Sequence, residues 1–427
     1  MSNDVFIIGA FSTTFGKKLE QSYKALVREA YLGVLGDSGL PVAIEPSRGD
    51  RSAHDISAAW FSNTTLHRQK CGMGAQILFT PLVREGLFPE HVAMTNVQNA
   101  CASGSSAMRG AYLDILSGEA ELALAIGVEK MIETDRSPAE TAAMFDLGID
   151  QFDPEEWRDY YQRAGDEAGK TFVVPPDRSM FMETYAMQAA WHMKTFGTTQ
   201  HDYAFAAAKA HNYGALNPRA HYRYSATPQA VIEEREISFP LTKPMCSPLS
   251  DGAAALLLCS DDYLASLPPE IRDRAVRIRA CKTSGGKYRS LSEPGLSYYA
   301  ARRAYDASGL APQDIDLAEV HDATSFSEIY QVEMLGFCPE GQGGGFVAEG
   351  NTGPGGSIPV NTSGGLVSKG HPIGATGISM IVELCEQLRH ESGERQVAGA
   401  GLALAESGGG VVGFDEAVCV VTILEKV

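Results

Sequence analysis

Short continuous apolar runs alternate along the chain with longer stretches in which apolar residues return every three or four positions. Residues 5–10 and 122–128 have the length and composition of buried strands. Residues 23–35 carry helical spacing, and Gly36 with the turn Asp37-Ser38-Gly39 is expected to end that helix. Strands followed by helices predict an α/β fold in which a mostly parallel sheet is covered on both faces.

The same order of elements returns in the second half of the chain. Residues 25–31, which lead to Ser38-Gly39-Leu40-Pro41, resemble residues 300–305, which lead to Ser308-Gly309-Leu310-Ala311-Pro312. Two equivalent helices with equivalent ends indicate an internal duplication. Further strands are predicted at residues 56–61, 91–97, 276–281, 317–321, 358–361 and 397–405, and further helices at residues 103–116, 180–196, 297–307, 326–335 and 378–388.

The duplication predicts an N-terminal half at residues 1–265 and a C-terminal half at residues 266–427. Residues 130–235 break the repeating pattern and are expected to form an inserted loop domain that caps the functional site. A glycine-rich loop is expected at residues 340–356.

Composition and charge exclude several classes of protein. The formal charge of −18 argues against sequence-independent binding of nucleic acid, which needs a basic surface. No apolar run reaches the roughly 18 residues of a membrane span. Met1 to Asp4 lead into a strand and form no basic leader, so we expect a cytoplasmic protein. The eight cysteines are scattered without a Cys-x-x-Cys pair, which favours neither a zinc knuckle nor a disulfide framework.

Cys101 is the first candidate for chemistry, because it falls between a predicted strand and a predicted helix among small residues. Its sulfur would meet free backbone amides and the positive end of the helix, which lower the pKa of a thiol and make it a nucleophile. The alternative is a buried structural cysteine, a common role for this residue type.

Two histidines complete the candidate set. His371 lies in Lys369-Gly370-His371-Pro372, where glycine permits close approach and the imidazole could hold a thiolate as an ion pair; a structural histidine is the alternative. His321, followed by Asp322, could donate to a developing enolate oxygen or orient a water that does so. A metal site is a weaker interpretation, since no third and fourth ligand occur at a recognisable spacing.

Four segments carry a resemblance to a known family. They are Asn99-Ala100-Cys101-Ala102-Ser103-Gly104-Ser105-Ser106-Ala107, Ser247-Pro248-Leu249-Ser250-Asp251-Gly252-Ala253-Ala254-Ala255, Asn361-Thr362-Ser363-Gly364-Gly365-Leu366-Val367-Ser368-Lys369-Gly370-His371-Pro372-Ile373-Gly374-Ala375-Thr376-Gly377 and Ala405-Glu406-Ser407-Gly408-Gly409-Gly410. Together, and in this order, they resemble the thiolases, in the version typical of the sterol-carrier-protein branch. The resemblance spans nearly the whole chain. It implies the thiolase fold, in which two duplicated βαβαβαββ halves form an αβαβα layered sandwich with an inserted loop domain.

The resemblance also implies roles for the site residues. The histidine matching His371 activates the nucleophile Cys101 and helps to bind the thioester oxygen, and His321 completes that oxyanion hole. The amides of Cys101 and Gly408 form a second oxyanion hole. The second cysteine that shuttles a proton in thiolases is replaced by Glu406 in the C-terminal motif and by alanine after His-Asp. The proton is therefore expected to pass through Glu406, His321 or an ordered water.

The implied activity is cleavage of a 3-oxoacyl-CoA by CoA, or the reverse Claisen condensation, through an acyl-cysteine. The absent second cysteine favours an aromatic or otherwise bulky β-keto thioester, as in benzoylsuccinyl-CoA thiolases. CoA is then a substrate, with no covalently bound cofactor and no metal, and the implied partners are a second copy of the chain and a small zinc-ribbon OB-fold protein. The alternatives are a C-acyltransferase that uses another carbon nucleophile and a non-catalytic thioester-binding subunit.

Overall fold

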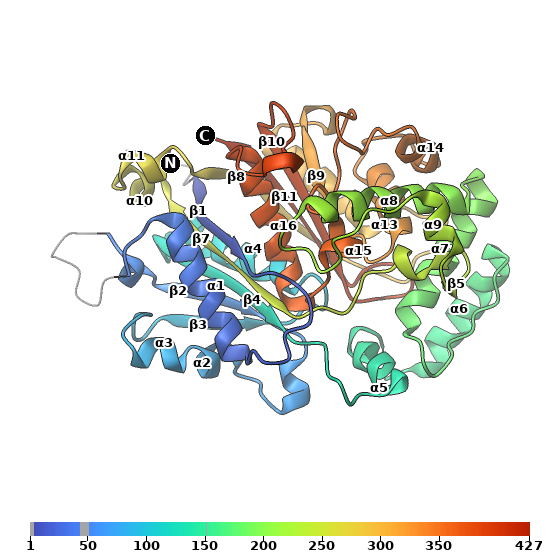
Figure 1. The fold of residues 1–427 in the computed structure, drawn as a ribbon, viewed down its shortest axis with the longest axis horizontal. Helices are drawn as coiled ribbons and strands as arrows, with labels where there is room; N and C mark the ends of the chain where they lie inside the picture. The colour runs from blue at the N-terminus through green and yellow to red at the C-terminus, as the bar shows by residue number, and fades with distance from the viewer. Residues whose placement is uncertain (1–3, 43–50, 151) are drawn as a thin grey trace.

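The computed structural model describes residues 4–42, 51–150 and 152–427, so the expectation placed on residues 1–3 lies outside the described part. One large sheet crosses the molecule in the order β3-β2-β4-β7-β1-β8-β11-β10-β9 (Figure 1). Its strands are β1 (Val5–Ser12), β2 (Ala58–Ser62), β3 (Ala93–Val97), β4 (Leu122–Glu129), β7 (Gly252–Ser260), β8 (Val276–Gly285), β9 (Leu317–Glu319), β10 (Leu402–Gly409) and β11 (Val418–Lys426).

The sheet is mixed, and the prediction of a mostly parallel sheet is wrong. Parallel pairing joins β2 to β3, β2 to β4, and β9 to β10. Antiparallel pairing joins β1 to β7 and β8, β4 to β7, and β11 to β8 and β10. Apolar periodicity identifies strands but carries no information on their direction. The last strand of each half, β7 or β11, returns through the middle of its half and reverses the pairing there.

The predicted duplication is confirmed by the pairing pattern. In the first half, β2 pairs with β4, β4 with β7, and β7 with β1. In the second half, β9, β10, β11 and β8 repeat these pairings in the same order and directions. The two halves meet where β1 pairs with β8, at Phe6 with Arg277 and Ile7 with Val276.

Equivalent helices also end in equivalent caps. Helix α1 (Tyr23–Ser38) ends at Gly39 and helix α12 (Leu296–Ser308) ends at Gly309. Each glycine has φ of 71° and returns its N–H to a carbonyl four residues back. The predicted stop at Gly36 is wrong, because a glycine in helical conformation continues the helix and only the left-handed glycine closes it.

Among the described residues, three large apolar cores define the layers. Along β4, Leu122, Leu124 and Ile126 pack under α1, whereas Ala123 and Ala125 face the opposite core. That middle core also holds the apolar faces of α4 (Ser103–Ser117) and α16 (Ile373–Leu388), which lie between the two half-sheets. The third core lies under α12 and α13 (Ser325–Met334) on the outer face of the second half-sheet. This is the expected αβαβα sandwich.

Residues 130–235 form a largely helical insertion beside the second half (Figure 1); residue 151 of this segment lies outside the described part. Its helices are α5 (Pro138–Ala143), α6 (Pro154–Ala168), α7 (Met180–Phe196), α8 (Gln200–Leu216) and α9 (Pro228–Glu233). The strand expected at 358–361 is reduced to a single parallel bridge between Ala318 and Val360. The glycine-rich segment 340–356 contains the helix α14 (Gly343–Ala348) and is not a plain loop.

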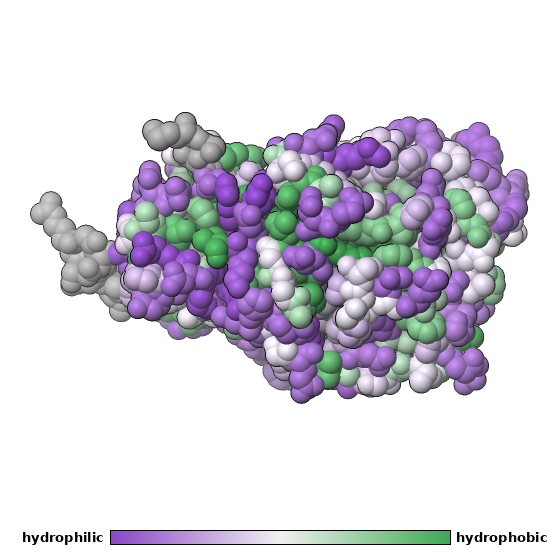
Figure 2. Space-filling view, turned by 90° about the horizontal axis from the view of Figure 1, so that it is seen from above, coloured by the Kyte–Doolittle hydropathy of each residue, from purple (hydrophilic) through white to green (hydrophobic). Residues whose placement is uncertain are grey.

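Polar side chains cover most of the face seen in Figure 2 and interrupt its apolar patches. Within residues 4–42, 51–150 and 152–427, no helix has both the length and the apolarity to cross a bilayer.

Candidate active site

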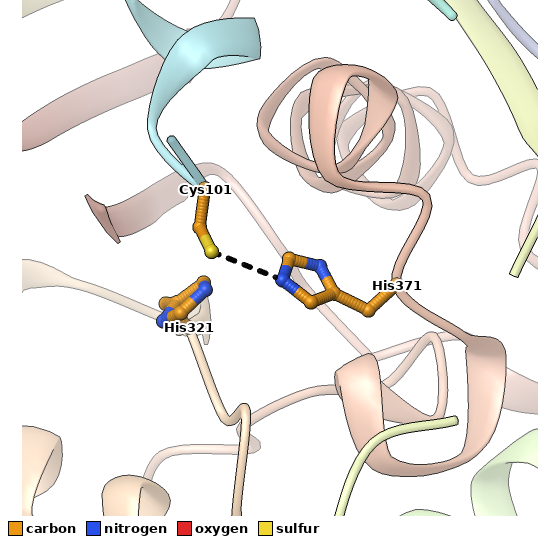
Figure 3. A group of neighbouring side chains, drawn as sticks. All are labelled: Cys101, His321 and His371. Atoms are coloured by element: carbon orange, nitrogen blue, oxygen red, sulfur yellow. Dashed lines mark hydrogen bonds between the residues drawn. The ribbon is translucent and has the colours of Figure 1, made fainter. Parts of the chain in front are cut away.

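Three of the predicted site residues converge at the ends of three different elements. Cys101 lies just before α4, His371 just before α16, and His321 just after β9. The Cys101 Sγ atom is 3.3 Å from His371 Nε2 (Figure 3). The ring centroids of His321 and His371 are 5.3 Å apart, and one ligand atom from each of the three residues lies within 4.8 Å of the others. Their side chains therefore share one site.

Close packing of α4 against α16 sets the distance between Cys101 and His371. A Cβ atom on Gly377 would lie 2.5 Å from the backbone nitrogen of Ser105, and one on Gly104 would lie 3.0 Å from the backbone nitrogen of Ile378. Only glycine lets the two helix starts approach this closely.

The nucleophile turn itself has a strained backbone. Ala100, directly before Cys101, has φ of 47°, a left-handed conformation that costs roughly 1–2 kcal/mol for a residue with a Cβ atom. Ser103 stabilises this turn, because its hydroxyl donates to the Ala100 carbonyl at 2.6 Å and accepts from the Asn99 amide at 2.8 Å.

Thr376 selects the tautomer of His371. The Thr376 hydroxyl donates its single proton to the Pro372 carbonyl at 3.0 Å, so it accepts from His371 Nδ1 at 2.8 Å. In the neutral imidazole the proton is then on Nδ1, and the lone pair of Nε2 faces the Cys101 thiol. His371 is therefore oriented to take the proton of that thiol.

The electrostatics of the site correct the prediction of a resting thiolate. Burial raises the pKa of the Cys101 thiol to about 12, and the carboxylates of Glu129 and Glu416 add to this rise. Burial also lowers the pKa of His371 well below its usual value, and that of His321 to about 4. The free protein thus holds a neutral thiol beside neutral imidazoles. The amides of Cys101 and Gly410 lower the pKa of this thiol, but burial outweighs them.

Two backbone amides favour a negative charge at the sulfur, those of Cys101 and Gly410. The sequence predicts Gly408 as the second donor of the oxyanion hole, and that role stays a prediction. Gly408 pairs with Cys419 inside the β10–β11 ladder, whereas Gly409 and Gly410 line the cavity beside Cys101. Because the run contains three successive glycines, the sequence alone could not identify which amide turns toward the sulfur.

Glu406, the predicted replacement for the second cysteine, supports His321 from behind. Its carboxyl accepts from the His321 amide at 3.0 Å and from the Cys419 thiol at 3.3 Å. Burial raises its pKa to about 7. It does not belong to the residues that line the cavity, whereas Ala323 does, so no thiol stands at that position. His321 Nε2 is buried and has no hydrogen-bond partner among the described residues.

Sequence reasoning missed Glu129, the buried residue that ends β4. Its carboxylate accepts from the amides of Thr64, Thr65 and Gly374 at 2.9, 3.1 and 3.0 Å and also receives both threonine hydroxyls. Glu129 thereby joins the loop after β2 to the start of α16, close to His371. An acid at the end of an otherwise wholly apolar strand is the signal that could have identified it.

A cavity of about 1040 Å³ opens in front of Cys101. Cys101 packs beside an apolar cluster within its wall, made of Met131, Met144, Phe145, Leu249 and Ile373. The insertion contributes further wall, including Tyr185 of α7, which the sequence did not single out. Three basic side chains also line this cavity, Arg178, Arg235 and Lys243.

The three converging side chains could also hold a soft divalent cation. The sequence shows no third and fourth ligand at a recognisable spacing, and in the structure Cys101 lies close to the two histidines, with one ligand atom of each residue within 4.8 Å of the others. Cysteine and histidine are ligands that Zn²⁺ prefers, and three of them leave a fourth position open.

Both halves of the chain match one family. Residues 5–236 match "Thiolase, N-terminal domain" and residues 291–424 match "Thiolase C-terminal domain-like". The acetyl-CoA acetyltransferase of Methanothermobacter thermautotrophicus is 34% identical over 96% of this chain and 97% of its own length. Human sterol carrier protein 2 is 34% identical over 97% of this chain and 73% of its own length. The benzoylsuccinyl-CoA thiolase subunit BbsB of Thauera aromatica is 26% identical over 93% of this chain and 92% of its own length.

Solved structures have the same fold. The Ltp2-ChsH2(DUF35) aldolase superposes with a TM-score of 0.75 at 22% identity and covers 98% of this chain and 97% of its own. The human mitochondrial 3-ketoacyl-CoA thiolase superposes with a TM-score of 0.65 at 17% identity and covers 99% of each chain.

Proposed function

Because this chain belongs to the thiolase family, we propose that it cleaves a 3-oxoacyl-CoA with CoA, or runs the reverse Claisen condensation, through an acyl group carried on Cys101. The chain is an acyltransferase of that family, for which CoA is a substrate. The observation that supports the proposal most directly is the 3.3 Å approach of the Cys101 thiol to the unprotonated nitrogen of His371.

The first step follows from that contact. His371 Nε2 takes the proton of Cys101 as Sγ attacks the β-keto carbon of the substrate. The resulting alkoxide accepts from the amides of Cys101 and Gly410, in place of the Gly408 amide expected from the sequence. Breaking the bond to the α-carbon then leaves an acyl group on the sulfur and an enolate of the departing acyl-CoA.

The two histidines stabilise that enolate. After the first step, His371 carries a proton on Nε2 and can donate it to the thioester oxygen. His321 Nε2 is buried without a partner among the described residues, so an incoming oxygen would satisfy it. Glu406 acts here as a positioning residue, because it fixes the backbone of His321. CoA then attacks the acyl-cysteine and releases the second product, and His371 returns its proton to the Cys101 sulfur.

The cavity supports a bulky or aromatic acyl group. Ligand sites usually measure about 300–1,000 Å³. The cavity reaches the top of that range, at about 1040 Å³, and places an apolar wall beside Cys101. Similarity to the benzoylsuccinyl-CoA thiolase subunit points in the same direction. Arg235 and Lys243 are exposed where they line the cavity, so they would meet the phosphates of CoA.

The test is a substrate screen with acetoacetyl-CoA, longer 3-oxoacyl-CoA thioesters and 3-oxo-3-phenylpropionyl-CoA, with mass spectrometry of the Cys101 peptide. We expect an acyl adduct on Cys101, faster turnover of the bulky thioesters, and loss of both in the Cys101→Ala variant. Cleavage that persists in Cys101→Ala would end the proposal. Products formed with another carbon nucleophile in the absence of CoA would favour the C-acyltransferase, and absence of any adduct would favour the non-catalytic subunit.

We also propose a homodimer and a small zinc-ribbon OB-fold companion. Strand β3 forms one edge of the sheet, and Leu113 and Leu116 of the adjoining α4 are 38% and 39% exposed, which suits a protein contact. The solved Ltp2-ChsH2(DUF35) aldolase and the subunit named BbsB supply the precedent for a companion. Light scattering of the purified chain tests the dimer, and full activity without any companion would remove that part of the proposal.

We also propose that the chain divides into an N-terminal half at residues 1–265 and a C-terminal half at residues 266–427. This division is supported by the break between β7, which ends at Ser260, and β8, which begins at Val276. A cytoplasmic location likewise stays a proposal, which fractionation of the native cell would test.

A further inference from the structure

The proposed reaction needs a group that moves the proton of the α-carbon. Cleavage leaves an enolate that must gain a proton on carbon, and condensation must remove one. Ala323 and Glu406 stand at the positions where thiolases carry the second cysteine, and the thiol of Cys246, which also lines the cavity, donates to the Thr242 carbonyl at 3.5 Å. Glu406 is engaged with the His321 amide and the Cys419 thiol. We propose that Tyr185, backed by Glu416, moves this proton, an inference that rests on the proposed function.

Tyr185 lies where two cavities meet. It extends from α7 of the insertion into the wall of the large cavity, which Cys101 and His371 also line. It also lines a second, smaller cavity together with Glu416 and Gln331. Within the described part of the chain, no side chain or carbonyl is hydrogen-bonded to the Tyr185 hydroxyl, so this group is free to meet a substrate atom.

The smaller cavity provides a path from Tyr185 to Glu416. Its volume of about 30 Å³ has room for one or two water molecules, since one water needs about 10–15 Å³. Gln331 Nε2 donates to Glu416 Oε1 at 3.4 Å. Gln331 Oε1, at this cavity, is buried without a hydrogen-bond partner among the residues described. Buried polar atoms of this kind are normally satisfied by water.

The relay formed by Tyr185 and Glu416 is expected to hold its protons at neutral pH. Burial raises the pKa of Tyr185 well above its usual value, and ionisation of Cys101 or Glu416 would raise it further. Burial raises the pKa of Glu416 to about 8, with the neighbouring Glu406 as the next cause. Both groups are therefore protonated at rest, so Tyr185 can act as an acid and Glu416 can restore its proton.

The steps balance over one turnover. When the bond between the α- and β-carbons breaks, the Tyr185 O–H bond breaks and a C–H bond forms on the departing acyl-CoA. Glu416 passes its proton to the phenolate and becomes a carboxylate. CoA attacks the acyl-cysteine as its thiolate, and the proton that the CoA thiol has already released to water returns to Glu416, which restores the pair. In the condensation direction the same path accepts the proton that leaves the α-carbon.

Tyr185→Phe separates this step from the formation of the acyl-enzyme. CoA leaves as a thiolate without help, because the pKa of a thiol is about 8.5. Tyr185→Phe should therefore still transfer the acetyl group of acetyl-CoA to Cys101, within about tenfold of the wild-type rate. Exchange of the α-hydrogens of acetyl-CoA with D₂O, and cleavage of acetoacetyl-CoA or 3-oxo-3-phenylpropionyl-CoA, should fall by roughly 100-fold or more.

Two further variants complete the experiment. Glu416→Gln should slow the exchange by roughly tenfold and remove the part of its pH profile that titrates near pH 8. Tyr299→Phe makes the same chemical change on a ring that is 44% exposed on α12, and should match wild type. Glu416→Gln also tests the inference if Tyr185→Phe does not fold.

The outcomes keep the two proposals apart. If the wild-type protein forms no acyl-Cys101, the proposed function fails. If wild type forms the adduct and exchanges deuterium while Tyr185→Phe exchanges as fast, only the relay is overturned. An equal loss of acyl transfer and exchange in Tyr185→Phe would show a merely structural role and also overturn the relay.

Discussion

A single methyl group added at Gly377 should separate the nucleophile from its base. The added Cβ atom would lie 2.5 Å from the backbone nitrogen of Ser105, whereas ordinary contact begins near 3.4 Å. Helix α16 must then move by about 0.9 Å relative to α4, the difference between those two values. If this movement lies along the line from Cys101 to His371, their 3.3 Å contact lengthens to about 4.2 Å, too long for a hydrogen bond to sulfur.

We expect Gly377→Ala to fold, with a loss of roughly 1–3 kcal/mol in the free energy of unfolding from overpacking. Its kcat/KM and its single-turnover rate of Cys101 acylation should fall by roughly 100-fold, because a displacement of about 1 Å can cost that much. Gly36→Ala is the matched control, since its Cβ atom would meet nothing within 4 Å and the residue is helical within α1. Normal acylation by Gly377→Ala would refute the idea that the helix crossing sets this distance.

Four further predictions concern the same site. Thr376→Val should lower kcat/KM by roughly tenfold, a loss of about 1.4 kcal/mol in transition-state stabilisation, because His371 Nδ1 loses its hydrogen-bond acceptor. Thr376→Ser keeps the hydroxyl and should keep the activity. Since burial raises the pKa of Cys101 to about 12, alkylation by iodoacetamide should keep rising with pH beyond pH 9; a plateau near pH 7 would reveal a resting thiolate. Zn²⁺ should inhibit turnover by binding the Cys101 thiol and the two histidines, and a chelator should reverse the inhibition. Turnover that is insensitive to Zn²⁺ would contradict the close approach of these three side chains. Glu129→Gln should lower the free energy of unfolding by at least about 1–3 kcal/mol in calorimetry. In either orientation of the amide, its NH₂ group replaces an oxygen that accepts from N–H donors such as that of Gly374, and it cannot accept from them. Unchanged stability would contradict this prediction.

The sequence was most informative where local geometry and chemistry coincide. Cys101 and His371 each precede a helix within a run of small residues, and these runs exist because two helices approach closely there. The helix ends at Gly39 and Gly309 could also be predicted, since each needs a glycine in the left-handed conformation. These features depend on only a few neighbouring residues, so the order of residues along the chain is enough to identify them.

The features that the sequence did not reveal depend on distant contacts. The raised pKa of the Cys101 thiol comes from burial and from Glu129 and Glu416, which approach it through the fold and not through the chain. Which of the three glycines turns its amide toward the Cys101 sulfur depends on where β10 ends, within a run of identical residues. Strand direction depends on which edge each returning strand joins, and apolar periodicity is the same for both directions.

The duplication also explains why the acid/base group had to come from elsewhere. Helices α4 and α16 stand in the middle layer of the two halves, and each presents one reactive residue at its start, Cys101 or His371. The repeat thus supplies a nucleophile and a base, and β9 adds His321 beside them. The insertion reaches the same cavity from another side through Tyr185. A change in that insertion, which carries Tyr185, can therefore alter the proton-transfer step without disturbing the packing that holds the thiol against the imidazole.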